Sequence, residues 1–435
     1  MLSGPDESPV SSGIAVTPWE AYSRRRRWSL LAILFLLATS NFFDKNIISV
    51  LFEPIKHNFH VSDTLLGLLS GFCFALFYAM AGLPVARWAD RGNRRTVITC
   101  AVAVWSIMTV LCGCAQTFWQ LALARVGVGA GESGTVPSAH SLIADYFPPE
   151  RRATAIGVFT ASGTMGYLLG LGLGGYIAAS YGWRAAFWLA GAPGVLLAII
   201  ARAGLAEPRL KSGYPASSGR TGGVRTALVA LMSKGSYRWA LLGAVLYTFI
   251  VQGALLFVPS FLVRVLHSSL AEAGLTYGAV AAVGSVAGTL TGGWAADRLR
   301  QRDLRWLAWL PAFGCVTALP FYLLAFSAER VRSCMLFVFL GQVLLSGVLP
   351  PMLAGVHAVC GKARRAVAIA LIYFAGTLLG SGLGPLVTGG MSDALSARYG
   401  EAGLRYALMV VVTILVCAGA AFCCCQRSMR RDEED

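Results

Sequence analysis

Two charged residues, Arg125 and Glu132, interrupt a segment that is otherwise apolar and rich in glycine. They are seven residues apart, which is close to two turns of an α-helix, so both side chains project from one face. Charged residues inside a membrane segment avoid lipid, pair with other polar groups and commonly mark a substrate or ion pathway. The spacing therefore predicts a buried polar face on this helix.

A second polar group lies in the first apolar segment, where Asn41, Asp44 and Lys45 stand at positions i, i+3 and i+4 and share a helix face. Left unpaired, four membrane charges would cost about 10 to 14 kcal/mol together, against a whole-fold stability of about 5 to 15 kcal/mol. The formal charges of Asp44, Lys45, Arg125 and Glu132 sum to zero. We therefore predict one paired network beside a polar cavity.

The composition places these residues in a membrane protein. Of the 435 residues, 56% are hydrophobic and only 13% are charged, a balance outside the range of soluble domains. The formal charge of +15 does not indicate nucleic-acid binding, because the basic residues lie in short clusters between apolar segments and not along one solvated face. The expected partners are membrane lipids and a small substrate, with the chain as a monomer.

Twelve apolar segments are long enough to cross the bilayer as helices. Six precede a linker at 207–236 that is rich in Gly, Ser and basic residues and has room for an interfacial helix, and six follow it. We predict an all-α integral membrane protein of two pseudo-symmetric six-helix bundles, at 24–206 and 237–426. A disordered tail at 1–23 and a short tail at 427–435 complete the chain. The predicted spans are 28–52, 63–88, 96–115, 118–146, 153–179, 183–205, 237–263, 270–296, 304–326, 331–357, 364–390 and 402–425.

The distribution of lysine and arginine predicts the orientation. Of the 36 basic residues, 27 fall in the tails, the linker and alternate loops on one side, seven fall at the other side and two lie inside spans. Basic residues stay on the cytoplasmic side. Both termini are therefore predicted to be cytoplasmic, in a multi-pass protein of the cell membrane.

The two halves repeat at an offset of 213 residues, which carries Arg151-Arg152-Ala153 onto Arg364-Arg365-Ala366 and Pro137 onto Pro350. Parallel halves with the substrate site between them are one architecture of secondary transporters. The same offset carries Arg125 onto Val338 and Glu132 onto Leu345. An alternative is that the charges only hold helices together, but a purely structural network would not be needed in one copy alone.

Several motifs resemble a known family. The stretch ARWADRGNRR at 86–95 is similar to the signature of the major facilitator superfamily between its second and third helices, with Ala86 in place of the usual Gly. NFFDK at 41–45, FHVSDTLLGLL at 59–69, RVGVGAGES at 125–133 and LIADYFPPERRA at 142–153 look like the Spinster branch. The resemblance is specific in the first half and generic in the second.

The resemblance implies a proton-coupled carrier in which Asp44 takes up the proton, with Arg125 and Glu132 close to it. An anionic substrate that draws the arginine away would change the proton affinity of such a carboxylate. Lys45 stands where the family commonly has Arg, so it keeps the charge without the planar fork. The resemblance also implies a gate of charged residues on the cytoplasmic side. The alternative is that these basic residues only fix the helix ends on that side of the membrane. The gate candidates are Asp90, Arg91, Arg94, Arg95, Asp145, Arg152 and Asp297.

The second half contributes polar but uncharged side chains to the predicted cavity. Basic groups enter the membrane only in the first half, which suits a single anionic headgroup with an aliphatic tail. The candidate substrate-binding residues are Arg125, Lys45, Asn41, Gln252, Gln342 and Tyr373.

Other kinds of site find no support in the sequence. The eleven cysteines show no disulfide framework or metal-binding spacing, and no P-loop, GxSxG or HExxH motif is present. We therefore expect neither an enzyme nor a cofactor or metal, with the proton gradient as the energy source.

The function predicted from the sequence is proton-coupled secondary transport by alternating access. Spinster-type carriers handle lysophospholipids and sphingoid phosphates, so the resemblance implies an amphiphilic lysolipid or sphingoid-type lipid with an anionic headgroup. One alternative is a proton-coupled symporter of small organic anions, for which Lys45 would supply a second cation. The other is a membrane sensor that keeps the fold without transport.

Overall fold

The computed structural model describes residues 19–20, 22–208, 224–361 and 364–433. Most of the predicted N-terminal tail and the middle of the predicted linker lie outside these residues. The described part is built from helices, because a backbone inside a bilayer must satisfy its own hydrogen bonds. The predicted all-α fold is thereby confirmed.

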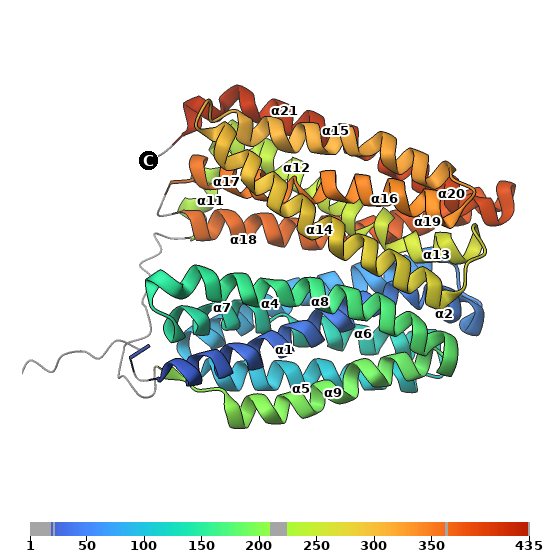
Figure 1. Cartoon of the computed structure of the whole chain (residues 1–435), viewed down its shortest axis with the longest axis horizontal. Helices are drawn as coiled ribbons and strands as arrows, with labels where there is room; N and C mark the ends of the chain where they lie inside the picture. Colours follow the sequence, from blue (N-terminus) through green and yellow to red (C-terminus); the bar gives the residue numbers. More distant parts are fainter. Residues whose placement is uncertain (1–18, 21, 209–223, 362–363, 434–435) are drawn as a thin grey trace, which may run out of the picture.

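The first half consists of helices that run up and down one bundle (Figure 1). Polar caps begin several of them: Ser23 accepts a hydrogen bond from the backbone of Arg26, and Thr117 and Gln120 form a capping box. The elements are α1 (Arg24–Val50), α2 (Phe52–Phe59), α3 (Asp63–Gly67), the π-helical η1 (Leu68–Phe72), α4 (Cys73–Arg91), α5 (Arg94–Cys114), α6 (Phe118–Glu132), α7 (Thr135–Tyr146), α8 (Pro149–Tyr181) and α9 (Trp183–Gly204).

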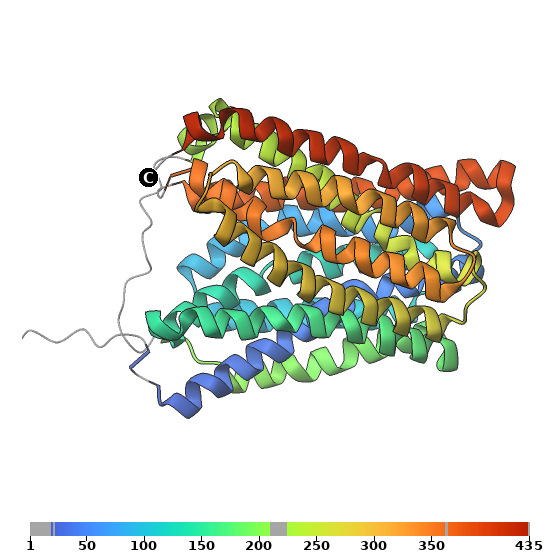
Figure 2. The ribbon, with the colours of Figure 1, turned by 45° about the horizontal axis from the view of Figure 1, so that its top comes forward.

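The second half forms the other bundle, and the views in Figures 1 and 2 show the two lying side by side. Its elements are α11 (Val224–Ser233), α12 (Gly235–Gln252), η2 (Ala254–Phe257), α13 (Val258–Arg264), α14 (Leu270–Arg300), α15 (Trp306–Ser327), α16 (Val331–Ser346), α17 (Leu349–Val359), α18 (Arg365–Ala375), the π-helical η3 (Gly376–Ser381), α19 (Gly382–Tyr399), η4 (Gly400–Ala402), α20 (Gly403–Val412) and α21 (Ile414–Asp432). The helix α11 lies in the predicted linker, and α21 continues through most of the predicted C-terminal tail.

The helices agree with twelve passes through a membrane. Ten segments of the described chain are long and apolar enough to span, and one of them, Arg365–Asp432, is 68 residues long and contains two legs. The predicted span 118–146 is a further pass. It is interrupted at Ser133 and Gly134, so neither α6 nor α7 reaches spanning length alone.

The repeat extends to this interruption. The offset of 213 residues carries 118–146 onto 331–359, which are the outer bounds of α16 and α17. Those two helices are likewise separated after Ser346, the counterpart of Ser133. The two halves therefore share a broken fourth helix, although the second half has Val338 and Leu345 where the first has Arg125 and Glu132.

The outer surface of the bundles is apolar. Leu123, Tyr181 and Leu290 are between 68% and 73% exposed, which in water would be a large unfavourable patch. Together with the span lengths, this surface makes the chain a multi-pass membrane protein.

The halves touch through small residues near one end of the molecule. A Cβ atom on Gly274 of α14 would collide with the carbonyl of Leu171 on α8, and one on Gly71 of η1 would lie 2.6 Å from the carbonyl of Gly382 on α19. Glycine at these positions therefore permits close helix approach. We call this end the opposite face. The other end, where α1 begins and α21 ends, is the terminal face (Figure 1).

Candidate proton and substrate site

The four predicted charges lie within the first half as one central cluster, formed by Asp44, Lys45, Arg125 and Glu132. Arg125 Nη1 lies 3.3 Å from Asp44 Oδ1, and the two side chains are 1% and 0% exposed. The other carboxylate oxygen of Asp44 accepts a hydrogen bond from Thr109 on α5. The sequence offered no signal for Thr109, because a lone threonine in an apolar helix usually bonds its own backbone.

An aromatic ring contacts both cations of the central cluster. Lys45 Nζ and Arg125 Cζ each lie 5.5 Å from the centre of the Phe74 ring on α4. Such contacts stabilise a desolvated cation by about 2 kcal/mol. Phe74 was not among the sequence-predicted residues, since a phenylalanine in a membrane helix carries no distinguishing pattern.

A buried polar atom of the central cluster lacks a hydrogen-bond partner among the described residues. Glu132 is 2% exposed and lies near Asn41. Arg125 Nε is buried and donates no hydrogen bond to any described residue. A buried unpaired polar group costs about 1 to 3 kcal/mol. A buried polar group without a partner calls for an explanation, and here it belongs to the ion pair of Asp44 and Arg125.

A cavity of about 240 Å³ lies between the two halves beside the central cluster. Among the predicted substrate residues, Lys45 and Gln252 line it. Gln342 lies behind it and donates a hydrogen bond of 2.9 Å to Ser285, which also lines the cavity. The complete lining is Phe42, Lys45, Asn46, Gly163, Thr164, Tyr167, Gln252, Ala282 and Ser285.

The remaining predicted substrate residues lie away from this lining. Arg125 and Asn41 are buried in the first half, with Arg125 committed to Asp44. Tyr373 on α18 is 54% exposed. Of the two membrane cations, only Lys45 therefore reaches the cavity directly.

Two of the predicted gate residues, Arg94 and Asp145, lie at the terminal face and form a cluster with Glu207, which we call the terminal-face cluster. Arg94 Nη2 lies 2.6 Å from Asp145 Oδ2 and 2.5 Å from Glu207 Oε1. Sequence reasoning missed Glu207, which it assigned to the linker. Arg94 and Asp145 belong to the first half and Glu207 follows α9, so the described ion pairs of this cluster do not join the two halves.

The other gate candidates also make no connection between the halves. Arg95 and Arg152 donate to backbone carbonyls of the first half, at Arg202 and Ala144. Asp297 is exposed and forms no ion pair with a described residue. The side chains of Asp90 and Arg91 lie outside the described part of the structure.

Charged residues join the halves at the opposite face instead. Arg264 of α13 lies 2.7 Å from Glu53 Oε1 and 2.6 Å from Asp63 Oδ2. Asp63 also pairs with Lys56 at 2.6 Å, and its backbone N–H donates to Asp393 of α19 at 2.9 Å. We call these five residues the opposite-face cluster.

The opposite-face cluster is not predicted by the sequence, in which Lys56 and Arg264 are two basic residues of loops or helix ends. Glu53 and Arg264 are 211 residues apart, so no local spacing relates them. Among the described residues, ion pairs join the two halves at the opposite face. None of the described ion pairs at the terminal face does so.

Comparison with known proteins agrees with this architecture. Residues 34–385 match the family described as Major Facilitator Superfamily. The chain is 36% identical over 401 residues to an MFS-type efflux pump of Mycolicibacterium smegmatis, covering 92% of each chain. It is 26% identical over 409 residues to the sphingosine-1-phosphate transporter SPNS2 of Danio rerio, covering 88% of this chain and 80% of that one.

A solved structure is similar over nearly the whole chain. It is that of a bacterial homologue of the human lysosomal transporter Spinster in an inward-facing and unoccupied conformation, with a TM-score of 0.87 and 31% identity over 95% of this chain and 100% of that one. The chain therefore belongs to the major facilitator superfamily of transporters, in its Spinster-like branch.

Proposed function

We propose that this transporter couples movement of an amphiphilic lipid with an anionic headgroup, of lysolipid or sphingoid type, to movement of protons by alternating access. The observation that carries the proposal is the fully buried ion pair of Asp44 and Arg125 beside a cavity that Lys45 lines. A charge pair of this kind is a default functional site inside a membrane.

In the proposed cycle Asp44 exchanges the proton. While ionised, its carboxylate is held by Arg125 and Thr109. A proton that adds to the Asp44 carboxylate removes the Coulombic attraction between Asp44 and Arg125. Glu132, which lies on the same helix as Arg125, is then the negative residue that remains in the central cluster. Substrate bound at Lys45 changes the charge balance of the same cluster, so that proton and substrate influence each other.

The proposed substrate class rests on the shape and charge of the cavity and on the likeness to a sphingosine-1-phosphate transporter. Lys45 is the cation at the cavity, and Gln252, Thr164 and Ser285 are neutral hydrogen-bonding groups. A volume of about 240 Å³ is small for a whole lipid, since pockets for drug-sized ligands measure about 300 to 1,000 Å³. We infer that the cavity holds the headgroup and that the aliphatic tail lies along the apolar surface.

The same small volume favours a second candidate, a proton-coupled symporter of small organic anions. A compact anion would fill the cavity without a tail outside it. Lys45 would then be its main cationic contact, with Arg125 still committed to Asp44.

The proposed orientation follows the basic residues. With the terminal face in the cytoplasm, the opposite-face cluster would lie on the outer side of a cell membrane, and the chain would face inward as a monomer. Rocking of the two bundles about their shared contacts would then expose the cavity to the other side.

The test is transport by the purified chain in liposomes with an imposed proton gradient. Uptake of a radiolabelled lysophospholipid and of a short dicarboxylate is compared for the native protein, Asp44→Asn, Arg125→Lys and a control, Glu329→Gln, which changes an exposed loop carboxylate. We expect gradient-dependent uptake of the lysolipid in the native protein and the control, and none in Asp44→Asn.

Three outcomes separate the proposals. Gradient-dependent lysolipid uptake that persists in Asp44→Asn would contradict the coupling role of Asp44. Uptake of the dicarboxylate alone would select the organic-anion symporter. No uptake of either by folded native protein would contradict both transport proposals.

A further inference from the structure

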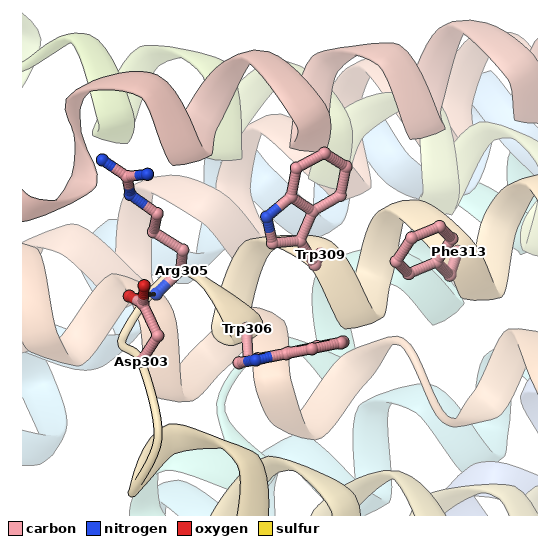
Figure 3. Close-up of a pocket in the computed structure, with 5 residues that line it drawn as sticks. All are labelled: Asp303, Arg305, Trp306, Trp309 and Phe313. Atoms are coloured by element: carbon pink, nitrogen blue, oxygen red, sulfur yellow. Dashed lines mark hydrogen bonds between the residues drawn. The ribbon is translucent and has the colours of Figure 1, made fainter.

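A second cavity, of about 290 Å³, lies at the terminal face where α15 begins, away from the central cluster. Figure 3 shows the residues that line it: Asp303, Arg305, Trp306, Trp309 and Phe313. None of them has a part in the proposed transport cycle.

The cavity carries one uncompensated positive charge. Asp303 is neutralised by Arg430 at 2.5 Å, and it accepts a hydrogen bond of 2.9 Å from the backbone N–H of Arg305. That N–H and the Arg430 guanidinium lower the pKa of the Asp303 carboxyl from its ordinary value, so Asp303 stays ionised and paired near neutral pH. The guanidinium of Arg305 points away from Asp303 (Figure 3). It forms no ion pair with a described residue, and its buried Nε donates to none of them.

Aromatic rings form the rest of the lining. Trp309 and Phe313 are one turn apart on α15 and stack at 5.5 Å between ring centres with an interplanar angle of 20°. Phe313 is 50% exposed. This surface offers an apolar ligand contact next to the cation.

The position of the cavity relates it to the bilayer. The apolar span of α15 begins at Trp306, so Arg305 stands immediately outside the span and Phe313 inside it. Tryptophan is typical of the boundary between hydrocarbon and headgroups. A ligand here meets charge at the headgroup level and aromatic rings at the level of the first acyl carbons.

We propose that this cavity binds an anionic phospholipid of the adjacent leaflet, with the phosphate at Arg305 and the glycerol and upper acyl chain against Trp309 and Phe313. Basic pockets between membrane helices recognise anionic headgroups in this way. A soluble anion would use the charge of Arg305 but would leave the aromatic surface without an apolar partner. The chemistry of the lining therefore favours a lipid over a free phosphate.

The test uses tryptophan fluorescence of the full chain in phosphatidylcholine vesicles. Dibrominated phosphatidylglycerol or dibrominated phosphatidylcholine is added as a quencher, and the difference between the native chain and Trp309→Phe gives the part of the signal that comes from Trp309. We expect quenching at Trp309 to be half-maximal at about a fivefold lower fraction of the anionic lipid, the factor that corresponds to about 1 kcal/mol for one basic residue.

Two variants separate the cavity from general surface charge. Arg305→Gln is expected to remove the preference for the anionic lipid. Arg302→Gln, which changes an exposed arginine of the same loop outside the lining, is expected to retain it. Equal quenching by both lipids in the native chain would overturn the proposal, as would equal losses in the two variants. Recovery of Trp309 fluorescence on adding millimolar inorganic phosphate would identify the ligand as a free anion instead.

Discussion

Replacing Arg264 with alanine is expected to separate the two halves at the opposite face. Arg264 of the second half contacts Glu53 and Asp63 of the first half at 2.7 and 2.6 Å. Within the described chain no other cation forms an ion pair between the halves. The two carboxylates are 7% and 1% exposed, so the substitution leaves buried negative charge with less compensation.

The size of the effect follows from this burial. Removing one partner of a buried ion pair costs about 3 to 5 kcal/mol. Lys56 remains 2.6 Å from Asp63, and the Arg264 side chain is 10% exposed, so we take about 2 to 3 kcal/mol. The contacts exist only while the halves are together at this face. The loss therefore shifts the equilibrium toward the arrangement open at the opposite face by about 30- to 160-fold.

A cysteine at position 49 reports the opening. Ser49 of α1 is 3% exposed and donates a hydrogen bond of 2.5 Å across the halves to the carbonyl of Leu256. Labelling of Ser49→Cys by a membrane-impermeant maleimide is measured with and without Arg264→Ala, and the signal of the native cysteines is subtracted. We expect labelling to be faster with Arg264→Ala. Arg264→Lys should be intermediate, because lysine keeps the charge but loses the bidentate fork.

The control is Arg330→Ala, since Arg330 is an exposed arginine at the same face that forms no ion pair with a described residue. Adding Glu53→Gln to Arg264→Ala should recover part of the protection by removing one unpaired charge. If Arg264→Ala and Arg330→Ala give the same labelling rate, the opposite-face cluster does not hold the halves together and the reasoning fails.

Three further predictions concern other parts of the molecule. Arg94→Ala should lower the melting temperature in detergent, because it removes the guanidinium that pairs with the 2% exposed side chain of Glu207, and breaking a buried ion pair costs about 3 to 5 kcal/mol; the exposed Arg151→Ala should change it little. Gly274→Val should expose the Ser49→Cys reporter, since its side chain would collide with the backbone of α8; a native labelling rate would contradict this. Lys45→Gln should raise the KM for an anionic substrate by about 10- to 100-fold, the loss of one charged hydrogen bond, while the KM for a neutral-headgroup analogue stays unchanged.

The fold was largely predictable from the sequence, because each membrane span can be recognised from the length and apolarity of one continuous segment. The length and apolarity of α14, for example, are properties of one continuous segment, and the predicted 270–296 differs from Leu270–Arg300 only at one end. The spacing of Arg125 and Glu132 likewise predicts a shared face, because the helix period is fixed. Features of this kind can be recognised within one segment, without knowing which helix packs against it.

The contacts between segments were not predictable in the same way. Thr109 and Phe74 approach the central cluster from α5 and α4, and nothing in their neighbourhood distinguishes them from other membrane residues. Glu207 was assigned to a linker by composition, yet it packs against Arg94, 113 residues earlier. Placing these residues requires the three-dimensional arrangement of helices that the periodicity of each helix leaves open.

The close glycine contact between α8 and α14 near the opposite face can act as a pivot about which α14 rotates relative to α8. From Gly274 to Arg300 the helix measures about 39 Å at 1.5 Å per residue, so a rotation of about 10° displaces the far end by about 7 Å. The contacts between α8 and α14 around Gly274 change little under such a rotation, because they lie at the pivot. If the second bundle rotates as one body with α14, the terminal face moves by several ångströms without repacking the core of either bundle.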